Sequence, residues 1–198
     1  MKKSNSKQKA LGAFKKLGVV ALITADTTVS VSFEPNPVEG GAVLILSPDH
    51  LNIKVSANTE DGSDITVEGC TETRLASDTK TTLHARGTTV ILKGKIIQLN
   101  CGNNKLTALN VQGLTALKQF GCFGNKLNAQ AMTELLNALP AREASDKAIA
   151  KLYLDYTYEG NCKDFSTPES LKTALDGAKK RNWKLIKKDA NGKDAEIE

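Results

Sequence analysis

Few side chains in this chain of 198 residues could carry chemistry. His50 and His84 are its two histidines, and neither stands in a sequence signature with a nucleophile or with paired metal ligands. The pattern GxxxxGK[ST] of phosphate-binding loops does not occur, and neither does the dinucleotide fingerprint. We therefore predict a protein that is not an enzyme and that takes no metal or cofactor. A hydrolase site assembled from residues far apart in the sequence would leave no such pattern, and it stays as an alternative.

Two short acidic segments are similar to calcium loops without meeting their requirements. Residues 61–64 read Asp-Gly-Ser-Asp, and residues 189–194 read Asp-Ala-Asn-Gly-Lys-Asp. Both lack the full ligand spacing and the closing glutamate of a calcium loop. We interpret both segments as turns.

The four cysteines are too few for a disulfide scaffold, and they have no CxxC spacing, so a zinc site is not indicated. Two of them, Cys101 and Cys122, fall at equivalent positions of a repeat. No proximity can be predicted for Cys70 and Cys162, and a bridge between these two stays open.

The repeat joins residues 96–106 to residues 117–127 at a step of 21 residues. The first segment reads Ile-Ile-Gln-Leu-Asn-Cys-Gly-Asn-Asn-Lys-Leu, and the second reads Leu-Lys-Gln-Phe-Gly-Cys-Phe-Gly-Asn-Lys-Leu. A period in the low twenties with this spacing is typical of a leucine-rich repeat. Each unit would form a short strand with alternate residues inward, and stacked units would share one core. The matched positions are Ile96 and Leu117, Leu99 and Phe120, Cys101 and Cys122, Asn104 and Asn125, and Leu106 and Leu127.

Asn104 and Asn125 would lie where the chain turns away from each strand. An amide side chain there can satisfy backbone groups of neighbouring units that would otherwise be buried without partners. Cys101 and Cys122 would sit side by side and point inward. Because parallel side chains suit the dihedral angle of a disulfide poorly, we expect reduced thiols that pack as small apolar residues.

We expect the array to continue with longer units. The strand pattern returns at residues 149–154, 32 residues after Leu117, with Leu152 and Leu154 pointing inward and Thr157 in the asparagine position. Helical periodicity follows Asn128 and Ser166, and a last strand is expected around Trp183. The alternative is that the two helices pack on the end of a shorter array without continuing it.

The predicted fold is therefore an α/β solenoid: a short leucine-rich-repeat array over residues 94–188, with a parallel strand face and helical C-terminal units. Residues 26–93 show short alternating runs separated by Pro, Gly, Asn and Asp, which predicts a β-rich N-terminal module or cap. Residues 189–198 are expected to form a flexible tail.

Residues 1–25 are predicted to be a signal-like export segment. They contain six lysines and no acid, followed by an apolar run over residues 17–25 that is too short to span a bilayer. The alternative is a basic amphipathic helix. Since the whole chain carries +5, the part after this segment is close to neutral, which argues against a nucleic-acid partner. No run of 18 apolar residues occurs, so no transmembrane segment is expected in the mature chain.

On the predicted strand face, the residues between the inward ones would point to solvent. Phe123 and Tyr153 are aromatic residues in such positions, and aromatic side chains are enriched among binding hot spots. The alternative is that both cover the flank of a capping loop. The candidate binding residues of this face are Gln98, Asn100, Gln119, Phe123, Lys151, Tyr153, Asp155 and Lys184.

Residues 96–119 and 125–140 resemble bacterial surface leucine-rich-repeat proteins of the BspA-like and internalin-like groups, especially their treponemal members. The resemblance covers about residues 43–188. It implies export to the periplasm, the cell surface or the medium, adhesion to host matrix or cell-surface proteins, and a role in virulence. Treponemal relatives often look like lipoproteins, whereas no cysteine follows the apolar run here. The matching residues are scaffold positions, so no binding residue is carried over from the family.

These observations predict an exported, non-enzymatic, adhesin-like protein that binds a host or cell-surface protein through its strand face. The alternative function is that of a structural or truncated paralogue of longer surface repeat proteins, without a ligand of its own.

Overall fold

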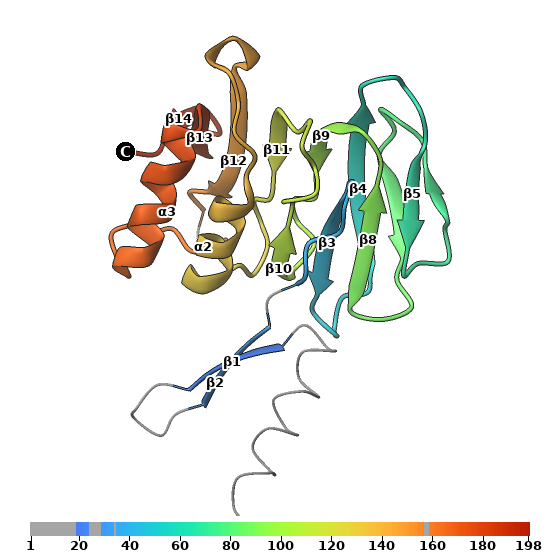
Figure 1. Ribbon diagram of the computed structural model, residues 1–198, viewed down its shortest axis with the longest axis horizontal. Helices are drawn as coiled ribbons and strands as arrows, with labels where there is room; N and C mark the ends of the chain where they lie inside the picture. The colour runs from blue at the N-terminus through green and yellow to red at the C-terminus, as the bar shows by residue number, and fades with distance from the viewer. Residues whose placement is uncertain (1–18, 24–28, 34, 157–158) are drawn as a thin grey trace, which may run out of the picture. The chain divides into compact units, whose positions relative to one another are not determined.

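The computed structural model divides the chain into two compact units, residues 1–36 and 37–198. In the first unit, β1 (Val19–Ile23) pairs antiparallel with β2 (Val29–Phe33) (Figure 1). The predicted export segment lies outside the described residues except for β1, and its role stays a prediction. The structure describes residues 19–23, 29–33, 35–156 and 159–198.

The second unit contains a five-stranded sheet in which all neighbouring strands are antiparallel. Alternation between buried apolar and exposed residues is clearest in β5, where Ile65 and Val67 are buried and Thr66 and Glu68 are exposed. Such alternation places one face of a sheet on a core. In spatial order the strands are β10 (Leu106–Asn110), β3 (Gly41–Leu46), β8 (Thr89–Lys93), β5 (Ile65–Glu68) and β6 (Arg74–Leu75).

The other sheet of this unit has seven strands and mixed directions. Four of its strands, β9, β11, β12 and β13, are parallel; β4 and β14 pair antiparallel with the outer two of these, and β7 pairs antiparallel with β4. In spatial order the strands are β14 (Asp194–Glu196), β13 (Trp183–Lys188), β12 (Ala148–Leu154), β11 (Gln119–Gly121), β9 (Ile96–Asn100), β4 (Asn52–Thr59) and β7 (Thr81–His84).

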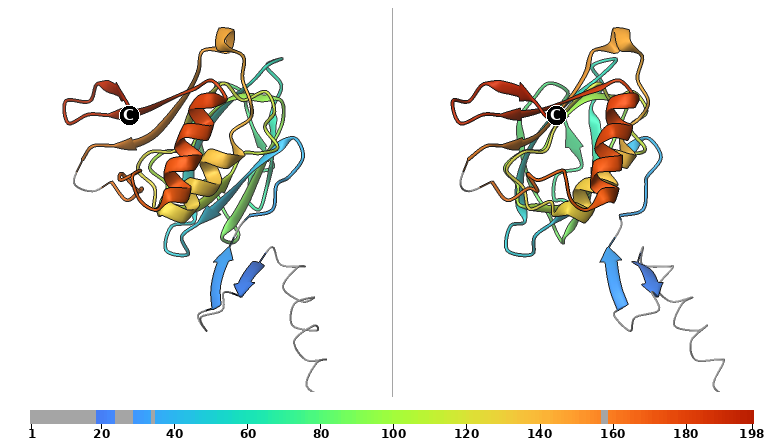
Figure 2. Two further views of the ribbon diagram at one scale, coloured as in Figure 1. Left: turned by 60° about the vertical axis from the view of Figure 1, so that its left-hand side comes forward. Right: turned by 90° about the vertical axis from the view of Figure 1, so that its left-hand side faces the viewer.

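Two helices continue the layer that the five-stranded sheet begins. α2 (Ala129–Ala138) lies beside β10, and α3 (Glu169–Lys180) packs against α2 and β13 (Figures 1 and 2). A short 3₁₀ turn, η2 (Ala144–Asp146), precedes β12. One continuous apolar core lies between this layer and the seven-stranded sheet. In the described part of the chain, no helix has the length and apolar character needed to cross a bilayer.

The ends of α2 are defined by side chains. The Asn128 side chain accepts a hydrogen bond from the backbone N–H of Ala131 at 2.9 Å, which caps the first turn. At the other end, the guanidinium of Arg181 donates to the carbonyl oxygens of Leu136 and Leu139, at 2.6 and 3.1 Å. A cation at this end also opposes the negative end of the helix dipole. Arg181 therefore fixes α2 against the C-terminal end of α3.

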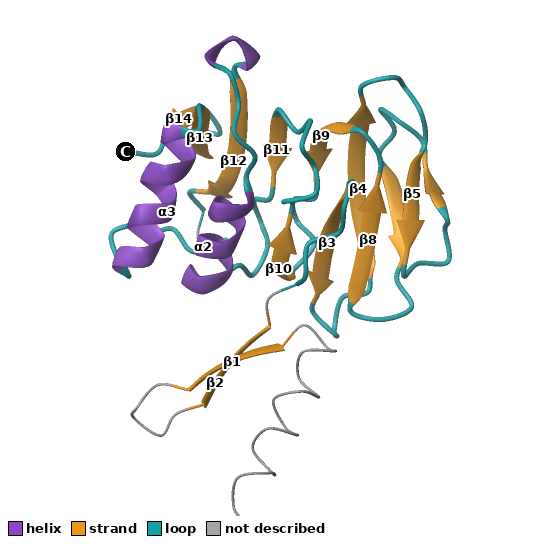
Figure 3. Ribbon diagram, in the orientation of Figure 1, coloured by secondary structure: helices purple, strands orange, loops and turns teal. Residues whose placement is uncertain are grey.

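The predicted α/β solenoid is wrong. Residues 37–198, as far as they are described, contain twelve strands in two sheets and two α-helices, which makes this a β-rich fold (Figure 3). The apolar spacing of the repeat specifies how β9 and β11 lie beside one another. It carries no information about the antiparallel strands that extend the sheet beyond β9 on one side and beyond β13 on the other.

Strand pairing also crosses the predicted domain boundaries. β4 of the predicted N-terminal module pairs with β9, and β3 pairs with β10, so residues 26–93 and 94–188 share both sheets. Residues 189–198, expected to form a flexible tail, include β14, which pairs with β13, and Ile197, which is 6% exposed. The local β pattern of residues 37–93 was readable from the sequence, but the partners of these strands were not.

Candidate binding site on the seven-stranded sheet

The parallel strands β9 and β11 pair in the register that the 21-residue step predicts, with Leu99 beside Phe120. The next register differs from the prediction, because Phe120 lies beside Ala150 and not beside Leu152. The outer face therefore places Ile149 beside Gln119 and moves Lys151 to the position next to Gly121.

Buried asparagines in the turns after the strands fix these registers. The Oδ1 of Asn125 accepts from the backbone N–H groups of Asn104 and Leu106, both at 3.0 Å, and its Nδ2 donates to the carbonyls of Cys101 and Cys122 at 3.1 and 2.7 Å. Asn125 is 2% exposed, so the N–H groups of Asn104 and Leu106 would lose this acceptor if the amide were removed. The carbonyls of Cys101 and Cys122 would keep the amides of Asn104 and Asn161 as donors.

Asn104 and Asn161 do the same on either side of Asn125. Asn104 accepts from the backbone N–H of Lys54 at 2.7 Å and donates back to the Lys54 carbonyl at 2.9 Å, which joins the antiparallel β4 to the parallel strands. Asn161 accepts from the Leu127 N–H at 3.0 Å and donates to the carbonyls of Cys122 and Leu152, both at 2.8 Å. The sequence predicted Thr157 for this role; that residue lies outside the described residues.

The predicted inward positions form the core under the candidate site. Cys101 and Cys122 are fully buried and, like Cys70 and Cys162, are not in disulfides. Burial raises the pKa of the Cys101 thiol to about 12 and that of Cys122 well above its ordinary value, so neither is a nucleophile at neutral pH. Leu154 is half-buried. The other buried positions of the predicted repeat are Ile96, Leu99, Asn104, Leu106, Leu117, Phe120, Asn125, Leu127 and Leu152.

A groove of about 440 Å³ lies on the outer face of this sheet. It crosses β9, β11 and β12 and reaches the hairpin of β13 and β14. Five of the eight predicted binding residues line it: Gln98, Asn100, Gln119, Phe123 and Lys151. The other polar residues of the groove, Lys188 and Asp194, were not among the candidate binding residues of the face, and Asp194 belongs to the segment expected to be a flexible tail.

The half-buried ring of Phe123 lies over two glycines, Gly121 at the end of β11 and Gly102 in the turn after β9. A Cβ added at Gly102 would stand 2.9 Å from Cε2 of Phe123, and one added at Gly121 would stand 3.5 Å from its Cε1. The ring thus rests on bare backbone and leaves its remaining surface to solvent. A search for binding residues misses this contact, although its sequence signal is a glycine, Gly102, that matches Phe123 at the 21-residue step.

Three predicted face residues lie outside the groove. β12 has a bulge between Lys151 and Tyr153, which turns Tyr153 to the other side of the sheet, where it is 6% exposed and stacks on Phe165 with ring centroids 6.1 Å apart. Asp155 is exposed near Lys187, and Lys184 is exposed near Glu196. The expectation that Tyr153 faces solvent is therefore wrong.

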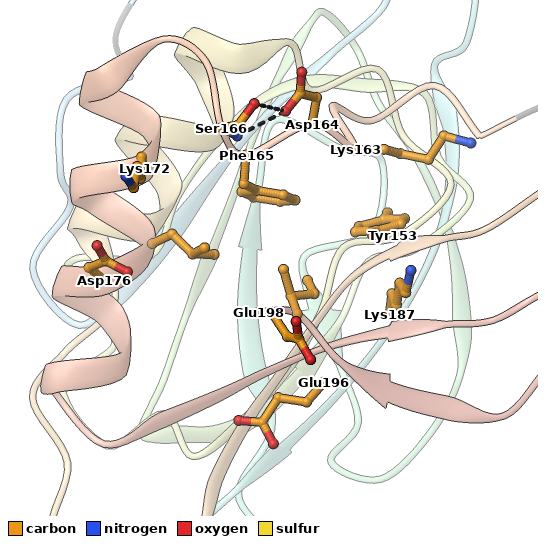
Figure 4. Close-up of a pocket in the computed structure, with 12 residues that line it drawn as sticks. Tyr153, Lys163, Asp164, Phe165, Ser166, Lys172, Asp176, Lys187, Glu196 and Glu198 are labelled. Atoms are coloured by element: carbon orange, nitrogen blue, oxygen red, sulfur yellow. Dashed lines mark hydrogen bonds between the residues drawn. The ribbon is translucent and has the colours of Figure 1, made fainter.

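A second cavity, of about 550 Å³, lies on that other side of the sheet, between α3, β12 and the chain's C-terminal residues (Figure 4). Its apolar lining includes Tyr153, Phe165, Leu175 and Ile197, each at most 7% exposed. Burial raises the pKa of the Tyr153 hydroxyl. The groove around Phe123 is the better candidate, because it holds five of the predicted binding residues and a half-exposed aromatic ring, whereas the rings of this cavity are buried.

The described residues contain no group of three or more His, Cys, Asp or Glu side chains that could hold a metal ion. His84 pairs with Glu72 through Nδ1 at 2.6 Å on the exposed strand β7. Hydrogen bonds from the His84 ring and from its backbone N–H lower the pKa of Glu72 to about 2. The nearby thiol of Cys70 is not a nucleophile at neutral pH, because burial raises its pKa to about 11.

Comparison of the chain with protein-family models, curated proteins and solved structures found no match.

Proposed function

We propose that this chain is a non-enzymatic binding protein and that the groove on the outer face of its seven-stranded sheet holds a segment of a protein partner. The observation that carries the proposal is the half-exposed ring of Phe123 on its glycine seat, flanked by amide side chains. Aromatic anchors in well-packed surroundings dominate many protein interfaces. The groove is shallow, which suits a weak contact or one strengthened by avidity.

Export and a cell-surface partner belong to the same proposal. The support for them is the lysine-rich segment followed by the apolar run in residues 1–25, which is typical of export signals. An exported protein with a binding groove would meet partners on other cells or in the surrounding matrix, which is the adhesin-like role.

The test compares the full-length chain with Phe123→Ala in binding to surface proteins of cultured cells and to matrix extracts. Ile91→Ala is the matched control, because Ile91 is a half-buried apolar residue on the five-stranded sheet, away from the groove. We expect Phe123→Ala to lose at least about tenfold in binding, which corresponds to about 1.4 kcal/mol, and Ile91→Ala to keep it.

Equal binding by the two variants would contradict the assignment of the groove. If the wild-type chain itself captures nothing, a structural role without a ligand is favoured.

A further inference from the structure

The charged end of the groove has more ammonium groups than carboxylates. Asp194 on β14 bridges two lysines: its Oδ2 lies 2.8 Å from Nζ of Lys151, and its Oδ1 lies 3.1 Å from Nζ of Lys188. All three side chains are between 34 and 42% exposed, so solvent and a partner can reach them. An ammonium has three N–H donors, and Lys151 uses one of them among the described residues. The two lysines can therefore bind a second carboxylate beside Asp194, or bind one in its place.

The opposite end of the groove presents uncharged amides. Gln98 and Gln119 lie beside one another on β9 and β11, and neither side chain has a hydrogen-bond partner within the described part of the chain. A primary amide can donate and accept, as a peptide group does, so these two amides can hydrogen-bond to the backbone of a bound segment.

Phe123 also lines the groove and follows β11, the strand next to that of Lys151. From β11 to β13 the groove spans two strand spacings, or about 10 Å. A polypeptide in the polyproline II conformation rises about 3.1 Å per residue and turns every third side chain to the same face, so it covers that distance in about three residues. An apolar side chain on the Phe123 ring and a carboxylate at the lysines would thus fit one short segment.

We propose, on the basis of the proposed function, that the groove binds an extended polypeptide segment crossing the strands, with an aromatic side chain on Phe123 and an acidic side chain about three residues away on Lys151 and Lys188. In the free protein, the carboxylate of Asp194 occupies the position of the acidic side chain of the partner. An acidic partner segment must displace Asp194 from the two lysines, so the β14 hairpin weakens the binding of such segments.

The test is an NMR titration of the isotope-labelled full-length chain with synthetic octapeptides of serine and glycine. One peptide carries Phe and, three residues later, Asp; the second carries Asn in place of Asp; the third carries Ala in place of Phe. Shifts are followed at the backbone amides of Gly121, Phe123 and Lys151, because the six N-terminal lysines would also attract acidic peptides. A site-specific signal separates the two sources of binding.

We expect the Asp peptide to bind about threefold more tightly than the Asn peptide, as one exposed ion pair allows. Asp194→Asn should tighten the Asp peptide by a similar factor, and Lys151→Gln should make the Asp and Asn peptides equal. The matched control is Glu68→Gln, which breaks the ion pair with Lys93 (2.6 Å) on the other sheet and should change nothing. Loss of the Ala-substituted peptide would support the role of Phe123.

Equal binding of the Asp and Asn peptides to the wild-type chain would overturn the inference, as would tighter binding of a heparin hexasaccharide at the same amides. If the cell-surface capture still depends on Phe123 in that case, the proposed function stands and only the partner chemistry fails. If Asp194→Asn disturbs the β14 hairpin, which the amide signal of Ile197 would report, the Lys151→Gln result decides alone.

Discussion

Two sets of amide side chains lie on the parallel strands and in the turns that follow them, and burial separates their roles. Below the strand ends, Asn104, Asn125 and Asn161 are 1–4% exposed and bond to backbone groups on both sides. On the outer face, Gln98 and Gln119 carry the same chemical group without a partner in the described part of the chain. A buried amide cannot be replaced by water at low cost, whereas an exposed one exchanges its partners freely. The inner set therefore holds the fold, and the outer set is available to a ligand.

The largest effect that would test this comparison is the loss of an inner amide. Asn125→Ala removes four hydrogen bonds and takes the acceptor from the N–H groups of Asn104 and Leu106, so we expect the free energy of unfolding to fall by about 3 kcal/mol. Gln119→Ala should stay within about 0.5 kcal/mol of the wild type, because its side chain is exposed. Urea unfolding of both variants measures the difference. Similar losses in the two variants would show that burial does not divide the amides in this way.

The same asparagines show how much of the fold could be predicted from the sequence. Residues 96–127 repeat without insertions, with two residues between each cysteine and its asparagine, so the 21-residue step predicted the register of β9 and β11 and the inward position of both amides correctly. The third asparagine comes nine residues after Leu152, and this longer connection hid Asn161 and shifted the predicted register of β12 by two residues. A period read from two copies does not report where a third copy has lengthened.

The site was predictable in its centre and not at its edges. Gln98, Gln119 and Phe123 follow from alternation along strands of known register. Tyr153 was assigned to the wrong face because a bulge adds one residue to β12, and a one-residue change reverses every side chain after it. Asp194 was missed because a three-residue strand next to Gly and Asn has too little apolar pattern to stand out from a tail.

A smaller effect is expected at Gly102 and Gly121, the two glycines on which the ring of Phe123 packs. In Gly102→Ala the new methyl group would meet Cε2 of Phe123 at 2.9 Å and the Phe123 backbone oxygen at 3.0 Å, so the ring must move, at a cost of about 1–2 kcal/mol. Gly121→Ala places its methyl group at 3.5 Å from the ring, an ordinary contact, and is the matched control. Thermal melting and the peptide titration should both separate the two variants. If Gly121→Ala also abolishes binding, the ring is not the anchor of the groove.

The smallest effect is expected at the charged end of the groove. Its dependence on pH distinguishes the exposed ion pairs from the buried, uncharged hydrogen bonds. The hydrogen bonds that Lys151 and Lys188 donate lower the pKa of Asp194 below its ordinary 3.8. A carboxyl whose pKa is lower in the folded state stabilises the fold above its unfolded pKa, and this contribution disappears as the pH falls through the folded value. Carboxyl ¹³C shifts followed by NMR should therefore give a midpoint for Asp194 below 3.8 that rises in Lys151→Gln.

The difference in melting temperature between the wild type and Asp194→Asn should be small at pH 7 and should vanish below the Asp194 midpoint. The loss from Asn125→Ala should differ in kind, because no amide titrates and its penalty persists wherever the fold does. A pH-dependent loss in Asn125→Ala, or an unshifted midpoint for Asp194, would show that the two sets of contacts are not separated as their burial implies.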